Sequence, residues 1–249
     1  MVNQQVNLRK LDVLFVNSDS SAQAYQGLAK TYAAIEPPTW ALLLAQSCRA
    51  KDFGVAILDC DAEKLSLQNA VDRIKDTNPR LVVFVVYGQN PNSGTTGMIG
   101  ASILAKELKQ HHPEFPICFV GSHTSAVPLE VLQNPFVDLV LLNEGVYALH
   151  NLLKTDLGSG LGEVLGIGFK SADESGETKL ILNPPQRVVP QERMDIDMPG
   201  YAWDFFLTNR APLTFTGRIF GTQSSIMKSV HPSLLFILLL GVLSRVISA

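Results

Sequence analysis

The sequence has few cysteines, little excess charge and no long apolar run near its start. Cys48, Cys60 and Cys118 are the three cysteines among 249 residues, and their wide spacing excludes a metal motif and an even disulfide framework. A reducing compartment is therefore expected. Residues 1–17 contain no signal-peptide pattern, which predicts a cytoplasmic protein. The net charge of -3 gives no electrostatic reason for a nucleic-acid partner, and none is expected.

Several signatures of cofactor chemistry are also missing. No Gly-x-Gly-x-x-Gly follows the first expected strand and no Walker loop occurs, which excludes the usual dinucleotide and nucleoside-triphosphate fingerprints. The apolar stretch at residues 234–243 is too short to cross a bilayer comfortably, so no stable membrane span is expected. This stretch is interpreted as a buried or interfacial segment, or as residues foreign to the ancestral fold.

The chain does contain short apolar runs that end in polar turns. The clearest run is residues 81–86, mostly β-branched, followed by a turn of Gly, Asn, Pro and Ser at residues 87–94. An apolar run bounded by turn residues predicts a strand that is buried on both faces. Four further strands are expected at residues 11–16, 55–58, 116–120 and 137–142.

Segments of helical composition separate these strands, at residues 40–49, 67–75, 96–110, 128–132 and 147–153. Alternating strands and helices predict an α/β fold with a doubly wound, five-stranded parallel sheet. The expected strand order is the flavodoxin-like 2-1-3-4-5, over about residues 9–155. A β-hairpin extension is expected at residues 165–182, around Ser175, Gly176 and Glu177.

Five polar loops follow the expected strands, at residues 17–21, 59–61, 87–94, 121–125 and 143–145. The carboxyl ends of parallel strands share one edge of a sheet, where ligands bind in open α/β folds. Glycines in these loops allow a ligand to approach the backbone. Helix N-termini beside them favour anionic groups such as phosphate. The sequence therefore predicts a ligand site at this edge.

Residues in and near these loops resemble the N-terminal cobalamin-binding domain of B12-dependent radical SAM enzymes. The resemblance rests on Glu36-Pro37-Pro38 before a helix, Asp59, the Tyr87–Pro91 turn, Gly121-Ser122-His123-Thr124 with Pro128, and Glu144-Gly145. Residues 166–168 and 198–204 also resemble the link into the radical SAM barrel of those proteins. The similarity covers about residues 11–207.

The resemblance implies a corrinoid lying flat across the carboxyl edge, with its nucleotide tail entering between the loops after the first, third and fourth strands. The implied cofactor-binding residues are Asn17, Ser18, Asp19, Ser20, Asp59, Tyr87, Gly88, Gln89, Asn90, Ser93, Gly121, Ser122, His123, Thr124, Glu144 and Gly145. Related cobalamin proteins often carry an Asp-x-His-x-x-Gly loop whose His ligates cobalt. Residues 17–21 read Asn-Ser-Asp-Ser-Ser, so no cobalt ligand is expected from this loop.

The sequence contains no counterpart of the catalytic radical SAM domain of these enzymes. Radical SAM enzymes hold a 4Fe–4S cluster through a Cys-x-x-x-Cys-x-x-Cys loop, and no cysteine follows Cys118. The expected organisation is a cobalamin-binding domain at residues 1–155, a hairpin and linker toward a missing radical SAM domain at 156–207, and a divergent apolar tail at 208–249. The chain alone is expected to be truncated and inactive, with the cluster and S-adenosylmethionine confined to a full-length relative.

Several of the named residues have two interpretations. His123 either contacts the corrinoid or is a solvent-exposed loop residue. Asp59 either binds a ligand or caps its loop. Glu144 either binds a ligand or stabilises the N-terminus of the following helix through its negative charge. Ser93 either contacts the nucleotide tail or caps a helix.

The function also has alternatives. A remnant or interaction module of flavodoxin-like fold without cofactor is the main one, and a flavodoxin-like domain for another nucleotide or a regulatory partner is the other. Trp40 and Trp203 are interpreted as packing anchors, and the cysteines as small buried hydrophobes.

Overall fold

The computed structural model describes residues 11–20, 37–87, 91–172 and 176–208. The chain divides into two units after residue 206, and the described residues up to that point form one compact unit. All the strands named below belong to the first unit.

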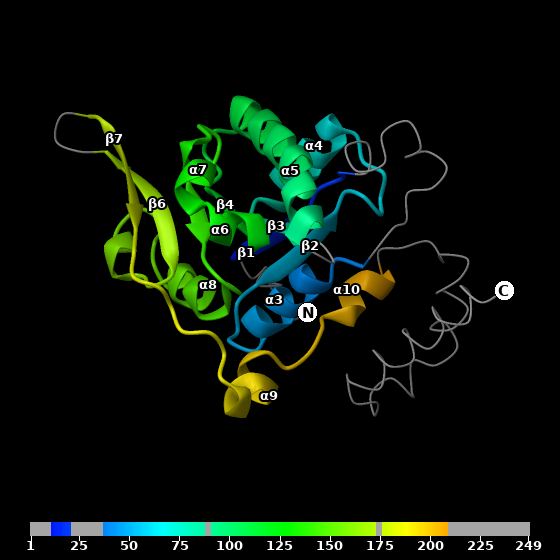
Figure 1. The fold of residues 1–249 in the computed structure, drawn as a ribbon. Helices are drawn as coiled ribbons and strands as arrows, with labels where there is room; N and C mark the ends of the chain where they lie inside the picture. Colours follow the sequence, from blue (N-terminus) through cyan, green and yellow to red (C-terminus); the bar gives the residue numbers. More distant parts are fainter. Residues whose placement is uncertain (1–10, 21–36, 88–90, 173–175, 209–249) are drawn as a thin grey trace, which may run out of the picture. The chain divides into compact units, whose positions relative to one another are not determined.

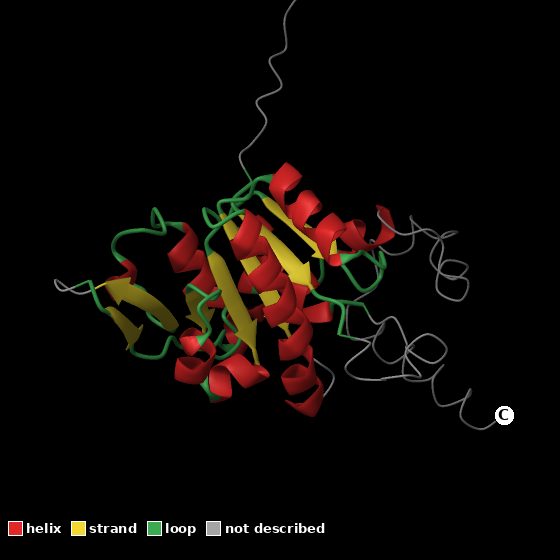
Figure 2. Cartoon of the chain, turned by 90° about the horizontal axis from the view of Figure 1, so that it is seen from above, coloured by secondary structure: helices red, strands yellow, loops and turns green. Residues whose placement is uncertain are grey.

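A seven-stranded sheet forms the centre of the first unit, in the order β2-β1-β3-β4-β5-β6-β7 (Figures 1 and 2). The strands are β1 Val13–Asn17, β2 Val55–Asp59, β3 Leu81–Val86, β4 Ile117–Gly121, β5 Leu139–Leu141, β6 Ile167–Ala172 and β7 Thr178–Leu182. The first five are parallel, as β1 pairs with β2 and β3, β3 with β4, and β4 with β5. The predicted flavodoxin-like order of these strands is confirmed.

The hairpin differs from the prediction because it continues the same sheet. β6 pairs antiparallel with β5, with Leu139 opposite Phe169, and β7 pairs antiparallel with β6. The sheet therefore has seven strands and not five. An unpaired β5 would expose a row of backbone N–H and C=O groups, and pairing with β6 satisfies them.

Helices cover both faces of the sheet (Figure 1). They are α3 Thr39–Arg49, α4 Leu67–Thr77, α5 Pro91–His111, α6 Ser122–Ala126, α7 Pro128–Gln133 and α8 Val146–Leu153, followed after the hairpin by α9 Met194–Asp197 and α10 Trp203–Thr208. Short 3-10 turns lie at Leu161–Glu163 and Gln191–Arg193. α3 and α8 pack on one face, and α4, α5 and α7 pack on the other.

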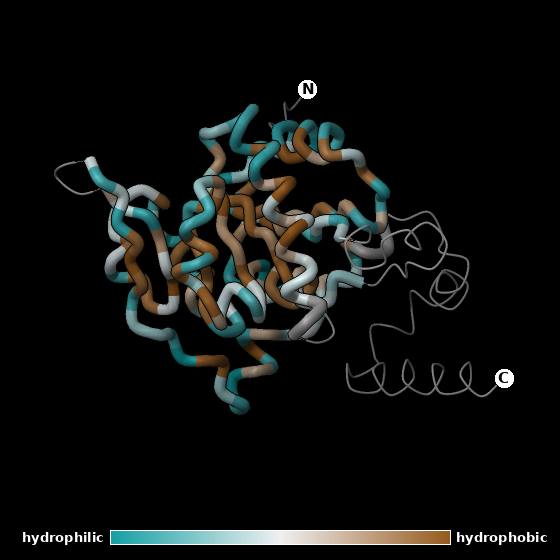
Figure 3. Tube along the Cα trace, turned by 45° about the horizontal axis from the view of Figure 1, so that its top comes forward, coloured by the Kyte–Doolittle hydropathy of each residue, from teal (hydrophilic) through white to brown (hydrophobic). Residues whose placement is uncertain are grey.

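Strand residues alternate between these two cores. Val13 and Phe15 pack with α3 and α8, whereas Leu14 and Val16 pack with α4 and α5. All four are almost completely buried. This arrangement explains the continuous apolar runs in the sequence, because both faces of each parallel strand lie against helices. Figure 3 shows the hydrophobic residues concentrated along the central strands.

Three segments differ locally from the predictions. α5 begins at Pro91, five residues before the expected start, because proline suits the first turn of a helix. The loop expected after β4 is largely the short helix α6. The linker expected up to residue 207 contains α9 and most of α10, whose short lengths gave no periodic signal.

No helix in the described part of the chain has the length and apolar character needed to cross a bilayer. The apolar stretch at residues 234–243 lies outside the described residues.

Candidate functional site

The ends of β1 and β2 are joined by a side-chain hydrogen bond at the carboxyl edge of the sheet. The Asn17 amide Nδ2 donates to Oδ1 of Asp59 over 2.9 Å. The same oxygen accepts from the backbone N–H of Ala62 at 3.2 Å. Asp59 is 7% exposed. Its carboxylate therefore caps its own loop and fixes the β1 loop, which supports the capping interpretation of this residue.

The β1 loop lies directly against helix α5. A Cβ added at Gly100 would overlap the carbonyl oxygen of Asp19 and approach Ser20. The glycine thus allows α5 to pass close to the backbone of residues 18–20. The structure therefore brings Ser18, Asp19 and Ser20 to the same edge as the helix that follows β3.

Glycines also bring β3, β4 and α5 unusually close together. A Cβ at Gly121, the last residue of β4, would overlap the carbonyl oxygen of Val86 at the end of β3. A Cβ at Gly94, in the first turn of α5, would overlap the hydroxyl of Ser122. The backbone of Gly121 is extended, so the requirement here is for space and not for a special φ angle.

Two buried polar atoms have no hydrogen-bond partner among the described residues: Ser122 Oγ and Trp40 Nε1. Trp40 lies in the first turn of α3, and its ring centroid is 4.7 Å from that of Tyr87, which directly follows β3. A buried polar group left unpaired costs about 1–3 kcal/mol. Both groups therefore suit a ligand that carries hydrogen-bond acceptors.

The turn between β5 and α8 connects several of the edge loops. The Tyr87 hydroxyl donates to the Asn143 carbonyl oxygen at 2.6 Å, and the Ser125 hydroxyl donates to the same oxygen at 3.4 Å. Asn143 and Gly145 both adopt positive φ, 56° and 75°. Between them, the Glu144 carboxylate accepts the backbone N–H of Val189.

Electrostatics keep the Tyr87 hydroxyl in its donor form. Burial, and then the negative charge of Glu144, raise the pKa of Tyr87 well above its ordinary value. The hydroxyl therefore keeps its proton and its hydrogen bond to Asn143 across the physiological pH range.

His123 and Thr124 lie on α6, beside the start of α5. His123 Nδ1 lies 3.2 Å from Thr95 Oγ1, in hydrogen-bond contact. Thr124 is buried, and its hydroxyl lies 3.9 Å from the sulfur of Met98. His123 is thus at the edge, whereas Thr124 packs inward.

Some of the predicted site residues fall outside the described part of the chain. They are Gly88, Gln89 and Asn90, and the side chain of Ser93. Trp40, in contrast, was not among the predicted site residues. Its only sequence signal was its position two residues after the Glu36-Pro37-Pro38 motif, at the start of the helix that follows β1.

The three cysteines are buried free thiols, as expected. Burial, and to a smaller extent the nearby Asp59, raises the pKa of Cys60 to about 12. Burial also raises the pKa values of Cys48 and Cys118. Thiolates are the form that binds metal. Over the described ranges, no group of three or more His, Cys, Asp or Glu side chains is arranged to hold a metal ion.

Comparisons with solved structures return the same fold. The radical S-adenosylmethionine methyltransferase TsrM from Kitasatospora setae, with cobalamin and a 4Fe–4S cluster bound, matches 73% of this chain at 16% identity and a TM-score of 0.52. The cobalamin-dependent S-adenosylmethionine radical enzyme OxsB matches 79% of this chain at 19% identity and a TM-score of 0.50. The chain spans only 30% of TsrM and 24% of OxsB.

No curated protein sequence matches the chain. The family model described as the B12 binding domain matches residues 25–153, just over half of the chain. The matched range contains α3, β2 to β5, the helices between these strands and the whole of α8. The resemblance inferred from the loop residues is thereby confirmed, and the chain belongs to the B12-binding domain family.

Proposed function

We propose that this chain binds cobalamin across the carboxyl edge of its parallel sheet. One observation carries the proposal: Ser122 Oγ and Trp40 Nε1 are buried at this edge without a hydrogen-bond partner among the described residues. Membership of the B12-binding domain family supports cobalamin as the ligand. TsrM, which shares the fold, has been solved with cobalamin bound.

The residues present fit the chemistry of this ligand. A corrinoid carries amide side chains around its ring and a phosphate in its nucleotide tail, so it offers many hydrogen-bond acceptors. The Ser122 hydroxyl and the Trp40 indole N–H would donate to such acceptors. The close approach at Gly121 leaves the end of β4 without a side chain that could obstruct the ring. The ring of Tyr87 would add apolar contact.

When bound, cobalamin supplies a cobalt centre that carries alkyl groups or electrons. This chain would bind and orient the cofactor and exclude water from one side of it. The Asn17–Asp59 and Tyr87–Asn143 hydrogen bonds would hold the edge loops in place before the ligand arrives. Residues 17–20 contain no imidazole, so the proposal includes no cobalt ligand from the β1 loop.

The proposal is limited to cofactor binding. TsrM was solved with a 4Fe–4S cluster as well, but this chain spans 30% of its length. The three cysteines of this sequence are buried in the sheet domain and have raised pKa values. We therefore propose no radical SAM chemistry for residues 1–249 by themselves.

The test is retention of corrin absorbance. Purified protein is mixed with hydroxocobalamin and desalted, and the visible spectrum is recorded beside a thermal unfolding curve. We expect stoichiometric retention and a raised melting temperature. Folded protein that retains no corrin would disprove the proposal and favour a module without cofactor.

A matched pair of variants locates the site. Trp40→Phe keeps an aromatic ring but removes the unpaired N–H, so we expect weaker binding by about one hydrogen bond, roughly fivefold in Kd. Trp203→Phe makes the same chemical change in α10, away from the edge, and is expected to change Kd much less. Equal Kd values for the two variants would place the ligand away from Trp40.

A further inference from the structure

Residues 183–205 form a segment, here called the strap, that leads from the hairpin past α8 to α3 (Figure 1). Its first residue is anchored, because Asn183 Nδ2 donates to the carbonyl oxygens of Leu161 at 2.6 Å and Val164 at 2.8 Å. Near its end, the Ala202 N–H donates to the carbonyl oxygen of Leu42 in α3 at 3.2 Å. The strap is thus fastened at both ends.

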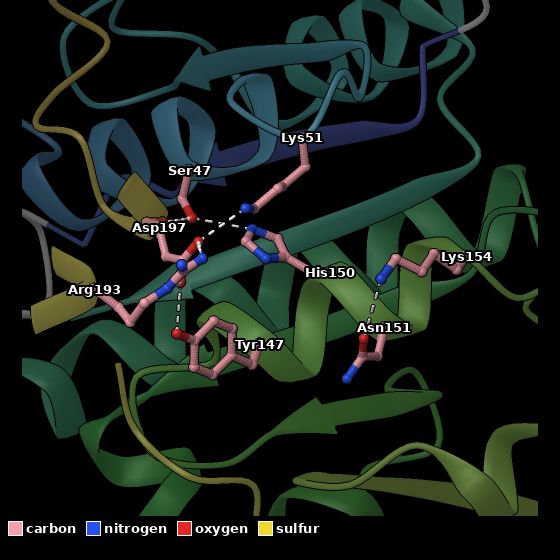
Figure 4. A network of polar contacts seen from close by, with 8 residues as sticks. All are labelled: Ser47, Lys51, Tyr147, His150, Asn151, Lys154, Arg193 and Asp197. Atoms are coloured by element: carbon pink, nitrogen blue, oxygen red, sulfur yellow. Dashed lines mark hydrogen bonds and ion pairs between the residues drawn. The ribbon is translucent and has the colours of Figure 1, made fainter. Parts of the chain in front are cut away.

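A buried carboxylate in the strap, that of Asp197, anchors it to α3 and α8 (Figure 4). Asp197, which is 2% exposed, accepts from Lys51 Nζ at 2.8 Å, from the Tyr147 hydroxyl at 2.7 Å and from Arg193 Nε at 2.9 Å. Lys51 follows α3 and Tyr147 belongs to α8. One side chain of the strap therefore joins both helices of this face.

The backbone of Asp197 is held by a second pair from the same helices. The Ser47 hydroxyl donates to the Asp197 carbonyl oxygen. A hydroxyl has one proton, so His150 Nε2, 3.0 Å from Ser47 Oγ, must be the donor in their contact. Nε2 of His150 therefore carries a proton, and burial and the charge of Lys51, which lower the pKa of His150 to about 4, keep the ring neutral near pH 7.

The strap also contacts the candidate site directly. The Glu144 carboxylate accepts the N–H of Val189, a strap residue that is 5% exposed. Glu144 sits between Asn143, whose carbonyl accepts from Tyr87 and Ser125, and Gly145. The turn that fixes the ends of β3 and β4 therefore also fixes the strap.

We propose that Glu144 is a positioning residue that couples docking of the strap to occupancy of the cofactor edge. The inference rests on the proposed cobalamin binding and adds a regulatory connection to it. A ligand held against Tyr87 and α6 would favour the hydrogen bonds of Tyr87 and Ser125 to the Asn143 carbonyl oxygen, and the turn that carries this oxygen presents the Glu144 carboxylate to Val189. Linkage makes the effect reciprocal, since a docked strap must then favour the ligand by the same factor.

Hydrogen exchange with mass spectrometry on the full chain tests the coupling. Exchange of the amides at residues 186–197 is compared with and without hydroxocobalamin, while corrin retention is measured on the same samples. We expect the ligand to slow exchange in this segment at least about fivefold, the lower end of ordinary coupling between sites.

Three variants test whether Glu144 transmits ligand binding to the strap or only supports the fold. Glu144→Ala removes the acceptor and should abolish the ligand effect on strap exchange. Glu144→Gln keeps a carbonyl oxygen and should preserve the effect. Glu192→Ala removes an exposed carboxylate of the strap and should behave as wild type. If Glu144→Ala does not fold, the wild-type comparison with and without ligand still decides the proposal.

The outcomes are distinguishable. Retained corrin with unchanged strap exchange in the wild type would overturn the coupling and leave cobalamin binding intact. An undiminished ligand effect in folded, corrin-binding Glu144→Ala would also overturn it. Folded protein without retained corrin would overturn the proposed function, and the coupling with it.

Discussion

The rings of Trp40 and Tyr87 pack at a tilt of 45° with their centroids 4.7 Å apart, and they join the start of α3 to the end of β3. The Trp40 indole N–H is buried and has no partner among the described residues. Tyr87, in turn, is held by Asn143. Three elements thus meet where the cofactor is proposed to bind.

Replacing Ser122 should weaken ligand binding without lowering the stability of the free protein. Ser122→Ala removes a buried hydroxyl that has no partner within the described part of the protein, so the melting temperature of the free protein should stay the same or rise. Hydroxocobalamin should bind about fivefold more weakly, for the loss of about 1 kcal/mol. Ser102→Ala in the middle of α5 serves as the control. A fall in both stability and affinity would show that Ser122 supports the fold and not the ligand.

Gly121→Ala should destabilise the protein through steric overlap. The added Cβ meets the carbonyl oxygen of Val86, which is backbone in a central strand and cannot move freely. Overpacking of this kind costs about 1–3 kcal/mol. Gly162→Ala is the matched control, since nothing in the described structure lies within 4 Å of its new Cβ. Urea unfolding measures both, and equal midpoints would contradict the packing argument.

Asp197→Ala should release the strap. The carboxylate receives hydrogen bonds from Lys51, Arg193 and Tyr147, and hydrogen bonds to charged groups contribute about 1.5–3 kcal/mol each. Lys51 and Arg193 are 35% and 43% exposed, so both cations can be rehydrated. The net loss should therefore be about 2–3 kcal/mol. Asp195→Ala, on the exposed side of α9, should leave the urea midpoint unchanged.

Acid should destabilise the protein through His150. Burial, and then the charge of Lys51, lower the pKa of His150 from 6.5 to about 4 in the folded state. Between these values the unfolded chain binds more protons, so stability falls as the pH drops through this window and is unaffected by this group above it. The full effect is about 3 kcal/mol by pH 4.

His150→Gln tests this origin, because its amide can still donate to Ser47 but does not titrate. Urea midpoints between pH 4.5 and 7.5 should slope less in the variant than in the wild type. Arg193, Lys51 and the Tyr147 hydroxyl lower the pKa of Asp197, so this carboxylate titrates below the window and does not obscure the comparison. Parallel slopes would assign the acid sensitivity to another group.

Residues 1–249 by themselves should not cleave S-adenosylmethionine. A radical SAM cluster needs thiolates gathered around one site, whereas Cys48, Cys60 and Cys118 are buried separately as thiols. Anaerobic reconstitution with iron and sulfide should give no stoichiometric cluster and no 5′-deoxyadenosine. Formation of both products would refute the expectation.

The parallel part of the fold was predictable because its strands are buried on both faces. Residues 81–86, for example, form a continuous apolar run and all are buried in β3. The pairing of β6 with β5 was not predictable, since a hairpin has the same local pattern whether it stands alone or extends a sheet. The early start of α5 at Pro91 was hidden by residues that are equally common in turns.

The sequence predicted that the site lies at the carboxyl edge of the sheet, but it did not predict the individual contacts there. Strand order alone brings the loops after β1, β3 and β4 together. The contact of Glu144 with Val189 joins residues 45 positions apart and leaves no trace in either local pattern. The orientation of Trp40 is likewise set by tertiary packing against Tyr87.

The crowding at the end of β4 has an evolutionary consequence. Gly121 is required by the sheet itself, because any side chain there would strike Val86. A descendant that no longer bound its cofactor would still need this glycine. Ser122, in contrast, is not needed for any protein hydrogen bond in the described chain. Relaxed selection on binding would therefore appear first as drift at position 122 beside an invariant position 121.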